Sequence, residues 1–366
     1  MATELGIALA HRGHEVHFIT YAAPFRLPTF HPRIFFHEGD VDRYPLFEYP
    51  PYDLALAVRM HEVVRSARLE VLHCHYAIPH ATSAWIAREM LQQKGEDVRL
   101  VTTLHGTDIT IVGQDPSFHA ITKFSIEKSD KLTAVSEYLR EETFSAFGCT
   151  ACAVQVIHNF IDPEVYDRAR YEPALRASLP PGRRVLMHVS NFRPVKRVLD
   201  VVRVFAQVRN EIPSVLVMVG DGPDRVAAEE EARRLGLQGA VFFLGRIDQV
   251  APLLANADLF LLPSQSESFG LSALEALASG VPVVASRAGG IPEVVRDGET
   301  GSLCAIGDVD GMARASLEIL GDQARWERMS ALAAADARER FSRDDVVARY
   351  EALYESAVML PADQRA

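Results

Sequence analysis

The string Glu267–Glu275, in which two glutamates flank Gly270, could bind a nucleoside phosphate. Gly270 falls where a strand-exit loop should become a helix, so the free N–H groups of the first helical turn can bind a phosphate. Glu275 lies inside that helix, where its carboxylate could accept hydrogen bonds from a ribose diol, whereas Glu267 stays on the loop. The alternative interpretation is one exposed loop glutamate and one helical surface glutamate.

A basic cluster, Arg193, Lys196 and Arg197, follows another expected strand. The chain carries 38 Lys and Arg against 49 Asp and Glu, a net charge of −11, so an anionic ligand must meet a local group of cations. A solvated helix start is the alternative, but cations at a helix N-terminus oppose the helix dipole, and a bound anion would remove that cost. The cluster therefore predicts a diphosphate site.

The first half of the chain places histidines and hydroxyl groups after two expected strands. His73 and His75 lie at the end of one strand and Tyr76 follows it, and His105 and Thr107 follow another. Ligands of open α/β sheets bind outside the carboxyl ends of the strands, so these residues form a second candidate site. A hydrogen-bonded structural histidine is the alternative for His105.

The elements that must position these residues alternate along the chain between apolar runs of strand length and amphipathic helical stretches. That alternation predicts parallel sheets built from βαβ units. The expected strands are Val16–Thr20, Ile34–His37, Val71–His75, Leu100–Leu104, Leu132–Val135, Val154–His158, Val185–Ser190, Val215–Val219, Val241–Leu244, Leu259–Leu262 and Val281–Ala285.

The length of 366 residues indicates two domains at about 150 residues each. Prolines cluster around residues 162–184, which suggests a linker there. We expect one Rossmann-like domain over 1–162 and another over 163–341, both doubly wound and facing a cleft. A helical tail over 342–366 should pack back on the first domain.

Composition narrows the function classes. A net charge of −11 is opposite in sign to the basic surface that nucleic acids or anionic membranes require. No apolar run is long enough for a membrane span, and the start lacks the pattern of a signal peptide, so we expect a cytoplasmic protein. The composition leaves open a possible homo-oligomer.

Metal and redox sites are not expected. Cys149 and Cys152 form a C-x-x-C pair, but the chain offers no second pair for zinc. Asp40 and Asp42 lie far from any phosphate string, and Asp308 is better explained as the cap of a helix over 311–320. His73 and His75 could be a half-buried pair on one strand face rather than two metal ligands.

The chain resembles the retaining GT-B glycosyltransferases of family four. The strings that carry this resemblance are Ser190–Arg197, Gly220–Pro223, Glu267–Glu275, Gly289–Val294 and Asn159–Asp162. Narrower strings resemble a subgroup of the family that serves bacillithiol synthesis, and they are Pro24–Leu27, Tyr49–Leu54, His75–Ala81, Thr102–Thr110 and His188–Arg193.

This resemblance implies metal-independent transfer of N-acetylglucosamine from UDP-N-acetylglucosamine to the hydroxyl of L-malate, with retention of the anomeric configuration. The implied catalytic residues are His105, Arg193, Lys196 and Glu267. The implied donor-binding residues are Asn191, Ser268, Phe269, Gly270, Leu271 and Glu275. The implied acceptor-binding residues are Arg26, Tyr76, Thr103 and Thr107. There are two alternatives. The enzyme could use another acceptor, such as a sugar or a lipid headgroup, or the chain could be a nucleotide-sugar-binding protein with little turnover.

Members of the family open with a strand and a glycine-rich loop. By this resemblance Met1 falls after that loop, so the sequence contains neither of them. Without that strand, the flanking strands would expose unpaired backbone groups. We therefore expect DNA upstream of the Met1 codon to encode, in frame, a strand and loop of roughly 15–20 residues, and the chain as written to be poorly soluble or nearly inactive.

Overall fold

The computed structural model describes residues 1–24, 26–39, 51–148, 153–179 and 181–360. The pairs Asp40 with Asp42 and Cys149 with Cys152 lie outside the described residues, as do parts of the strings Pro24–Leu27 and Tyr49–Leu54. The chain forms two compact units, one made of Met1–Asn159 with Asp344–Ala366 and the other of Phe160–Arg343. The proline-rich residues 162–179 thus belong to the second unit, and the last helix belongs to the first.

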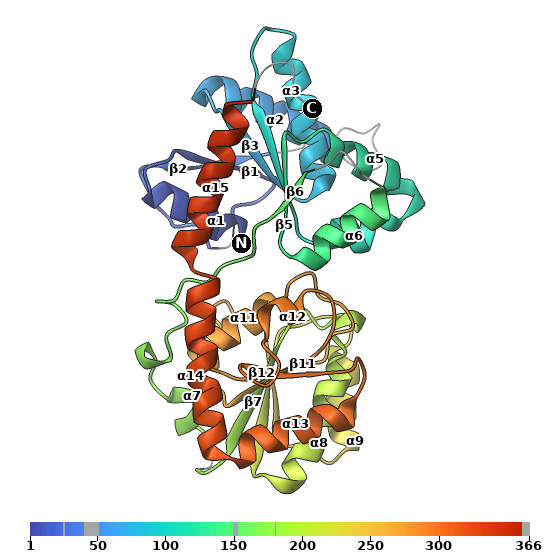
Figure 1. The fold of residues 1–366 in the computed structure, drawn as a ribbon, viewed down its shortest axis with the longest axis vertical. Helices are drawn as coiled ribbons and strands as arrows, with labels where there is room; N and C mark the ends of the chain where they lie inside the picture. Colours follow the sequence, from blue (N-terminus) through green and yellow to red (C-terminus); the bar gives the residue numbers. More distant parts are fainter. Residues whose placement is uncertain (25, 40–50, 149–152, 180, 361–366) are drawn as a thin grey trace. The chain divides into compact units, whose positions relative to one another are not determined.

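Over the described residues, the first unit contains six parallel strands in two separate sheets (Figure 1). One sheet pairs β1 (Val16–Thr20) with β2 (Ile34–Glu38). The other has the order β3 (Val71–His75), β4 (Arg99–Leu104), β5 (Lys131–Ala134) and β6 (Val154–Val156). Its longer helices are α1 (Ala2–His11), α2 (Tyr52–Ala67), α3 (Thr82–Gln92), α5 (Pro116–Glu127), α6 (Glu137–Phe147) and α15 (Arg343–Val358).

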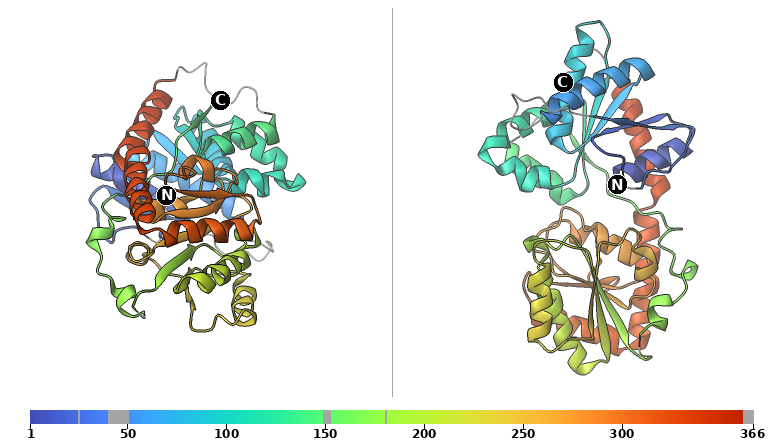
Figure 2. Two further views of the ribbon diagram at one scale, coloured as in Figure 1. Left: turned by 60° about the horizontal axis from the view of Figure 1, so that its bottom comes forward. Right: turned by 180° about the vertical axis from the view of Figure 1, so that it is seen from behind.

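The second unit has helices on both faces of one parallel sheet (Figure 2). The strand order is β12 (Gly301–Cys304), β11 (Val283–Ser286), β10 (Leu259–Leu262), β7 (Arg184–Val189), β8 (Ser214–Val219) and β9 (Val241–Gly245). Its longer helices are α8 (Val198–Glu211), α9 (Arg225–Arg234), α11 (Leu271–Ala278), α13 (Val309–Gly321) and α14 (Gln323–Arg340). The four central strands β7, β8, β10 and β11 are almost entirely buried, as both faces of a covered parallel sheet must be.

Amphipathic spacing explains how the helices attach to this sheet. On α8, Val201, Val202, Phe205 and Val208 recur at helical spacing and are all buried in the core of the second unit. The carboxyl ends of β7 and β10 are thereby fixed, and the loops that leave them carry the predicted donor residues. None of the helices in the described parts combines the length and apolar character that a bilayer crossing requires.

Candidate active site

The backbone around Gly270 has the predicted form of a strand-exit loop that becomes a helix. Gly270 has a φ of 98°, which glycine adopts without steric cost, and α11 begins directly after it. Phe269 is only 2% exposed, and its ring packs edge-to-face on Phe341 with 5.6 Å between the ring centroids. Phe269 therefore anchors the loop through its side chain, which leaves the backbone of Ser268–Leu271 to meet a ligand.

Glu267 and Lys196, both predicted as catalytic, lie in direct contact. The Nζ of Lys196 donates to Oε1 of Glu267 over 2.6 Å, and the Ser264 hydroxyl donates to the same oxygen over 2.9 Å. The loop of Glu267 is held from the other side by Gly289 and Gly290. A Cβ on Gly289 would lie 2.0 Å from the Glu267 carbonyl oxygen, and the Gly290 N–H donates to that oxygen over 2.8 Å.

The three cations of the basic cluster separate into two groups. Arg197 donates to Asp200 over 2.7 Å at the start of α8, so it stabilises the helix rather than completing a cluster of free cations. Lys196 and the exposed Arg193 lie on the turn before α8, and within the described ranges the Arg193 guanidinium forms no ion pair. Two of the three cations, Arg193 and Lys196, therefore remain as candidates for the diphosphate site.

Glu275 is half-buried on α11 and has a partner that the sequence analysis missed. The Tyr166 hydroxyl donates to Oε1 of Glu275 over 2.6 Å, and Tyr166 is only 6% exposed. No periodicity links two residues so far apart in the chain, so nothing in the sequence pattern could have paired them. Asn191 lies exposed on the turn after β7.

In the first unit, His105 is paired with His75. The Nε2 of His105 lies 2.8 Å from Nδ1 of His75, and His80 donates through Nδ1 to the His75 backbone carbonyl over 2.7 Å. Burial lowers the pKa of His105 to about 3, so its imidazole is neutral near pH 7. A neutral imidazole with Nε2 engaged has Nδ1 left to donate or accept one hydrogen bond from a substrate.

Thr103 lies beneath this pair rather than beside open space. It is 1% exposed, and its hydroxyl lies 2.7 Å from Nε2 of His73 and 2.7 Å from the Thr133 hydroxyl. His73 in turn contacts the Tyr354 hydroxyl of α15 over 2.8 Å. With that burial, Thr103 can influence an acceptor only through the groups that it holds.

Asp108 ties two loops of the first unit together, which the sequence analysis did not foresee. Its carboxylate accepts from the N–H groups of Gly106 over 2.9 Å and Ala77 over 3.0 Å. It thereby fixes Tyr76, which is 37% exposed and whose ring centroid lies 5.0 Å from that of His105. Thr107 is exposed at the start of the short helix α4 (Thr107–Thr110).

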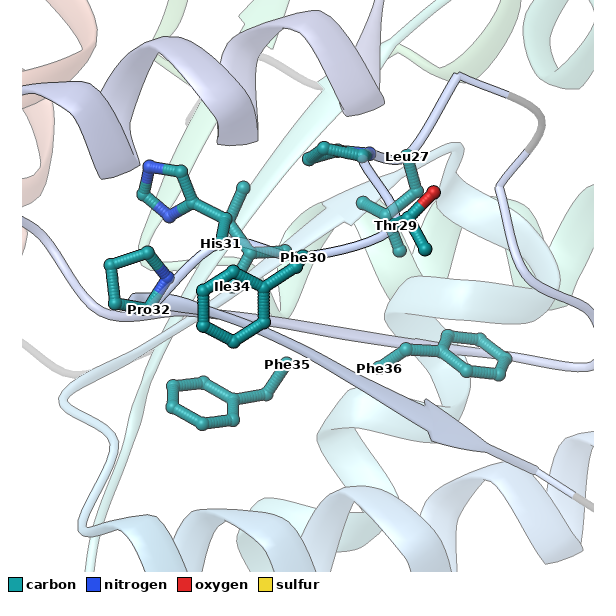
Figure 3. A pocket seen from close by; sticks show the side chains of 9 residues that line it. Leu27, Thr29, Phe30, His31, Pro32, Ile34, Phe35 and Phe36 are labelled. Atoms are coloured by element: carbon teal, nitrogen blue, oxygen red, sulfur yellow. The ribbon is translucent and has the colours of Figure 1, made fainter.

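Arg26 has an ion-pair partner on α1. Its guanidinium donates to Glu4 over 3.2 Å, and its side chain is largely exposed. Next to it along the chain, nine residues between Leu27 and Phe36 line an apolar cavity whose walls include Phe30 (Figure 3). Neither Arg26 nor any other predicted site residue lines that cavity.

Within the described ranges, His, Cys, Asp and Glu side chains form no group of three that could hold a metal ion. Asp308 acts as predicted, because its carboxylate accepts the Gly311 N–H over 2.8 Å and caps α13.

The second unit can offer an anion three groups of hydrogen-bond donors, which are the Lys196 ammonium, the Arg193 guanidinium and the N–H groups that begin α11.

Two family models match the chain. Glycosyltransferase Family 4 matches residues 1–165, and Glycosyl transferases group 1 matches residues 174–336. A relative from Bacillus anthracis, N-acetyl-alpha-D-glucosaminyl L-malate synthase, is 46% identical over 97% of this chain and 92% of its own length. A glycogen synthase from Mycobacterium tuberculosis is 31% identical over 76% of this chain and 66% of its own length.

Solved structures agree on the fold. HepE from Anabaena, in complex with UDP and glucose, matches with a TM-score of 0.78 and 20% identity over 97% of this chain and 96% of its own. The resemblance drawn from the sequence strings is thus confirmed. The chain belongs to the family 4 glycosyltransferases, and it is a glycosyltransferase with the GT-B fold.

Proposed function

We propose that this enzyme transfers N-acetylglucosamine from UDP-N-acetylglucosamine to the hydroxyl of L-malate and retains the anomeric configuration. The observation that carries the proposal is the 46% identity, over nearly the full length of both chains, to a synthase named for that product. We place the reaction in the cytoplasm, and other family 4 acceptors remain the alternative. The geometry of the second unit suits a nucleotide-sugar donor.

The donor side follows from the contacts of Glu275, Lys196 and Glu267. A carboxylate accepts several hydrogen bonds, so Glu275 can hold a ribose diol while Tyr166 orients it. Lys196 has three donors and can keep Glu267 while it donates to the diphosphate. Glu267 then meets the sugar hydroxyls, and Arg193 and the first turn of α11 meet the phosphates. Ser268 and Asn191 border that site.

The chemical step is a substitution at the anomeric carbon. Its bond to the diphosphate oxygen breaks, a bond to the malate hydroxyl oxygen forms on the same face, and the malate proton passes to a phosphate oxygen of the leaving group. Negative charge grows on the diphosphate, so Lys196 and Arg193 stabilise the transition state more than the ground state. A neutral His105 can form one hydrogen bond with a substrate through Nδ1 without adding charge.

Replacing Glu275 by alanine should weaken UDP binding by roughly 1.5–3 kcal/mol, because a charge-assisted hydrogen bond to the ribose is lost. Titration calorimetry with UDP measures this. The control is Glu318→Ala, which removes a carboxylate from an exposed position on another helix of the same unit, α13. Equal UDP affinity in a folded Glu275→Ala variant would reduce Glu275 to a helix surface residue.

L-malate should be a far better acceptor than neutral hydroxy compounds, because two carboxylates can recruit N–H groups, the Tyr76 and Thr107 hydroxyls and the Arg26 cation. A panel of hydroxy acids, glycerol and simple sugars with UDP-N-acetylglucosamine as fixed donor tests this, with the product anomer assigned by NMR. Equal rates with glycerol would remove malate from the proposal, and donor binding without any transfer would favour the binding-protein alternative.

Transfer should continue in excess EDTA, because we propose that cations of the protein, and not a metal ion, neutralise the diphosphate. Initial rates with EDTA, and with added magnesium or manganese after EDTA treatment, provide the measurement. A strict requirement for either metal would contradict the metal-free mechanism.

A further inference from the structure

His188 is a buried titratable residue that the proposed reaction does not use. It lies on β7 with no exposed surface, and its Nδ1 is 2.8 Å from the backbone carbonyl oxygen of Leu261 on β10. A carbonyl oxygen only accepts, so Nδ1 carries the proton. Burial lowers the pKa of His188 to about 4, so the ring is neutral near pH 7 and its Nε2 is an acceptor.

The hydrogen bonds continue from His188 into the turn that follows β7. Nε2 of His188 lies 2.8 Å from the Ser190 hydroxyl, which must therefore donate to it. The Ser190 oxygen in turn accepts the Phe192 N–H over 3.2 Å. Three hydrogen bonds of defined direction thus connect β10 to the turn.

The turn itself has a conformation that needs support. Phe192 has a φ of 40°, in the left-handed region that bulky residues seldom adopt, and its ring is completely buried. Two glycines that follow β8 lie directly against the turn. A Cβ on Gly220 would lie 1.8 Å from the Ser190 carbonyl oxygen, and one on Gly222 would lie 2.1 Å from that of Asn191.

This turn carries the cations that face the donor. The Lys196 N–H donates to the Arg193 carbonyl over 2.8 Å, and the Gln265 N–H donates to the Val195 carbonyl over 2.8 Å. The turn is thereby connected to the loop of Glu267, which Lys196 also contacts. A change in the backbone at Phe192 would move Lys196 relative to Glu267.

We propose that His188 and Ser190 are positioning residues for the donor diphosphate, because their hydrogen-bond chain fixes the turn that presents Arg193 and Lys196. The proposal rests on the proposed function, since it assumes that these cations meet a nucleoside diphosphate. Neither residue needs to touch the donor. The preorganised turn places both cations before the donor arrives, so binding need not order them.

Two variants separate positioning from structural support. Ser190→Ala removes the hydroxyl group in the middle of the hydrogen-bond chain. His188→Asn can keep a donor toward the Leu261 carbonyl, because an asparagine amide nitrogen takes the place of Nδ1, but it offers Ser190 no acceptor. Ser214→Ala on β8 is the matched control, because that buried hydroxyl has no hydrogen-bond partner among the described residues.

We expect UDP to bind about tenfold more weakly to Ser190→Ala and His188→Asn, as loss of one hydrogen bond of typical strength predicts. The KM for the donor should rise while the KM for malate stays the same, and Ser190→Thr, which keeps the hydroxyl, should restore most of the affinity. Ser214→Ala should match the unmodified enzyme. Titration calorimetry, initial rates and thermal melts give the three readouts.

If both variants bind UDP as tightly as the unmodified enzyme does, the positioning role is overturned and the proposed function stays intact. A lower melting temperature together with a rise in both KM values would overturn it too, because that pattern indicates general structural damage. Failure of the unmodified enzyme to bind UDP would count against the proposed function. Amide hydrogen exchange of residues Phe192–Lys196 would then test whether the hydrogen-bond chain fixes the turn. Faster exchange in Ser190→Ala would support this role, and unchanged exchange would contradict it.

Discussion

Replacing Lys196 by alanine should lower kcat by about 100- to 1000-fold, the loss typical of removing one preorganised donor from a developing negative charge. The KM for malate should change little, because we propose that Lys196 meets the donor diphosphate and not the acceptor. The ammonium group lies 2.6 Å from Glu267, which holds the lysine side chain in place. Initial rates over a matrix of donor and malate concentrations measure both constants.

Two companion variants separate the charge of Lys196 from its contact with Glu267. Lys196→Arg keeps the charge and should retain more activity than the alanine variant, and Glu267→Gln breaks the ion pair but keeps the cation. Thermal melts of all three variants are the control. If stability and activity fall together in Lys196→Ala and in Glu267→Gln, Lys196 serves to hold Glu267 and does not stabilise the leaving group.

Strands with strong apolar runs could be predicted closely from the sequence. Val16–Thr20, Val71–His75 and Leu259–Leu262 have the predicted bounds, because β-branched and other apolar side chains in short runs favour buried strands. β12 (Gly301–Cys304) was missed. It is an edge strand that begins with glycine and serine and is only half-buried, so it carries no apolar pattern to find.

The candidate site could be predicted as a set of loops but not as a set of contacts. Gly270 was found because a local change from strand to helix marks it. The pairings of Glu275 with Tyr166 and of His105 with His75 depend on how distant segments pack, which spacing along the chain does not encode. Thr103 shows the same limit, since its position on β4 was predicted and its burial against His73 was not.

The buried histidines should make the first unit acid-sensitive. Burial lowers the pKa values of His73 and His105 to about 3, from the 6.5 of an exposed histidine, and it lowers those of His75 and His80 as well. Between pH 6.5 and 3, the unfolded chain therefore binds more protons than the folded one. The contribution of these groups is fully present above pH 6.5 and is lost as the pH falls.

The expected size follows from the linkage relation. At pH 5, His73 and His105 each lower the free energy of unfolding by about 2 kcal/mol relative to pH 8, or about 4 kcal/mol together. His75 and His80 act in the same direction. Asp108 opposes them, because burial raises the pKa of its carboxyl, but it is one group against four. In the second unit, His188, with a pKa of about 4, contributes about 2 kcal/mol in the same direction as the other histidines.

The chain has two tryptophans, and one lies in each unit, so the two responses can be measured separately. A Trp326→Phe variant reports the first unit through Trp85, and a Trp85→Phe variant reports the second through Trp326. Urea unfolding followed by fluorescence at pH 8 and pH 5 should show a larger fall in the midpoint for Trp85 than for Trp326. Equal falls, or a Trp85 midpoint independent of pH, would show that the four imidazoles become protonated without unfolding the sheet around them.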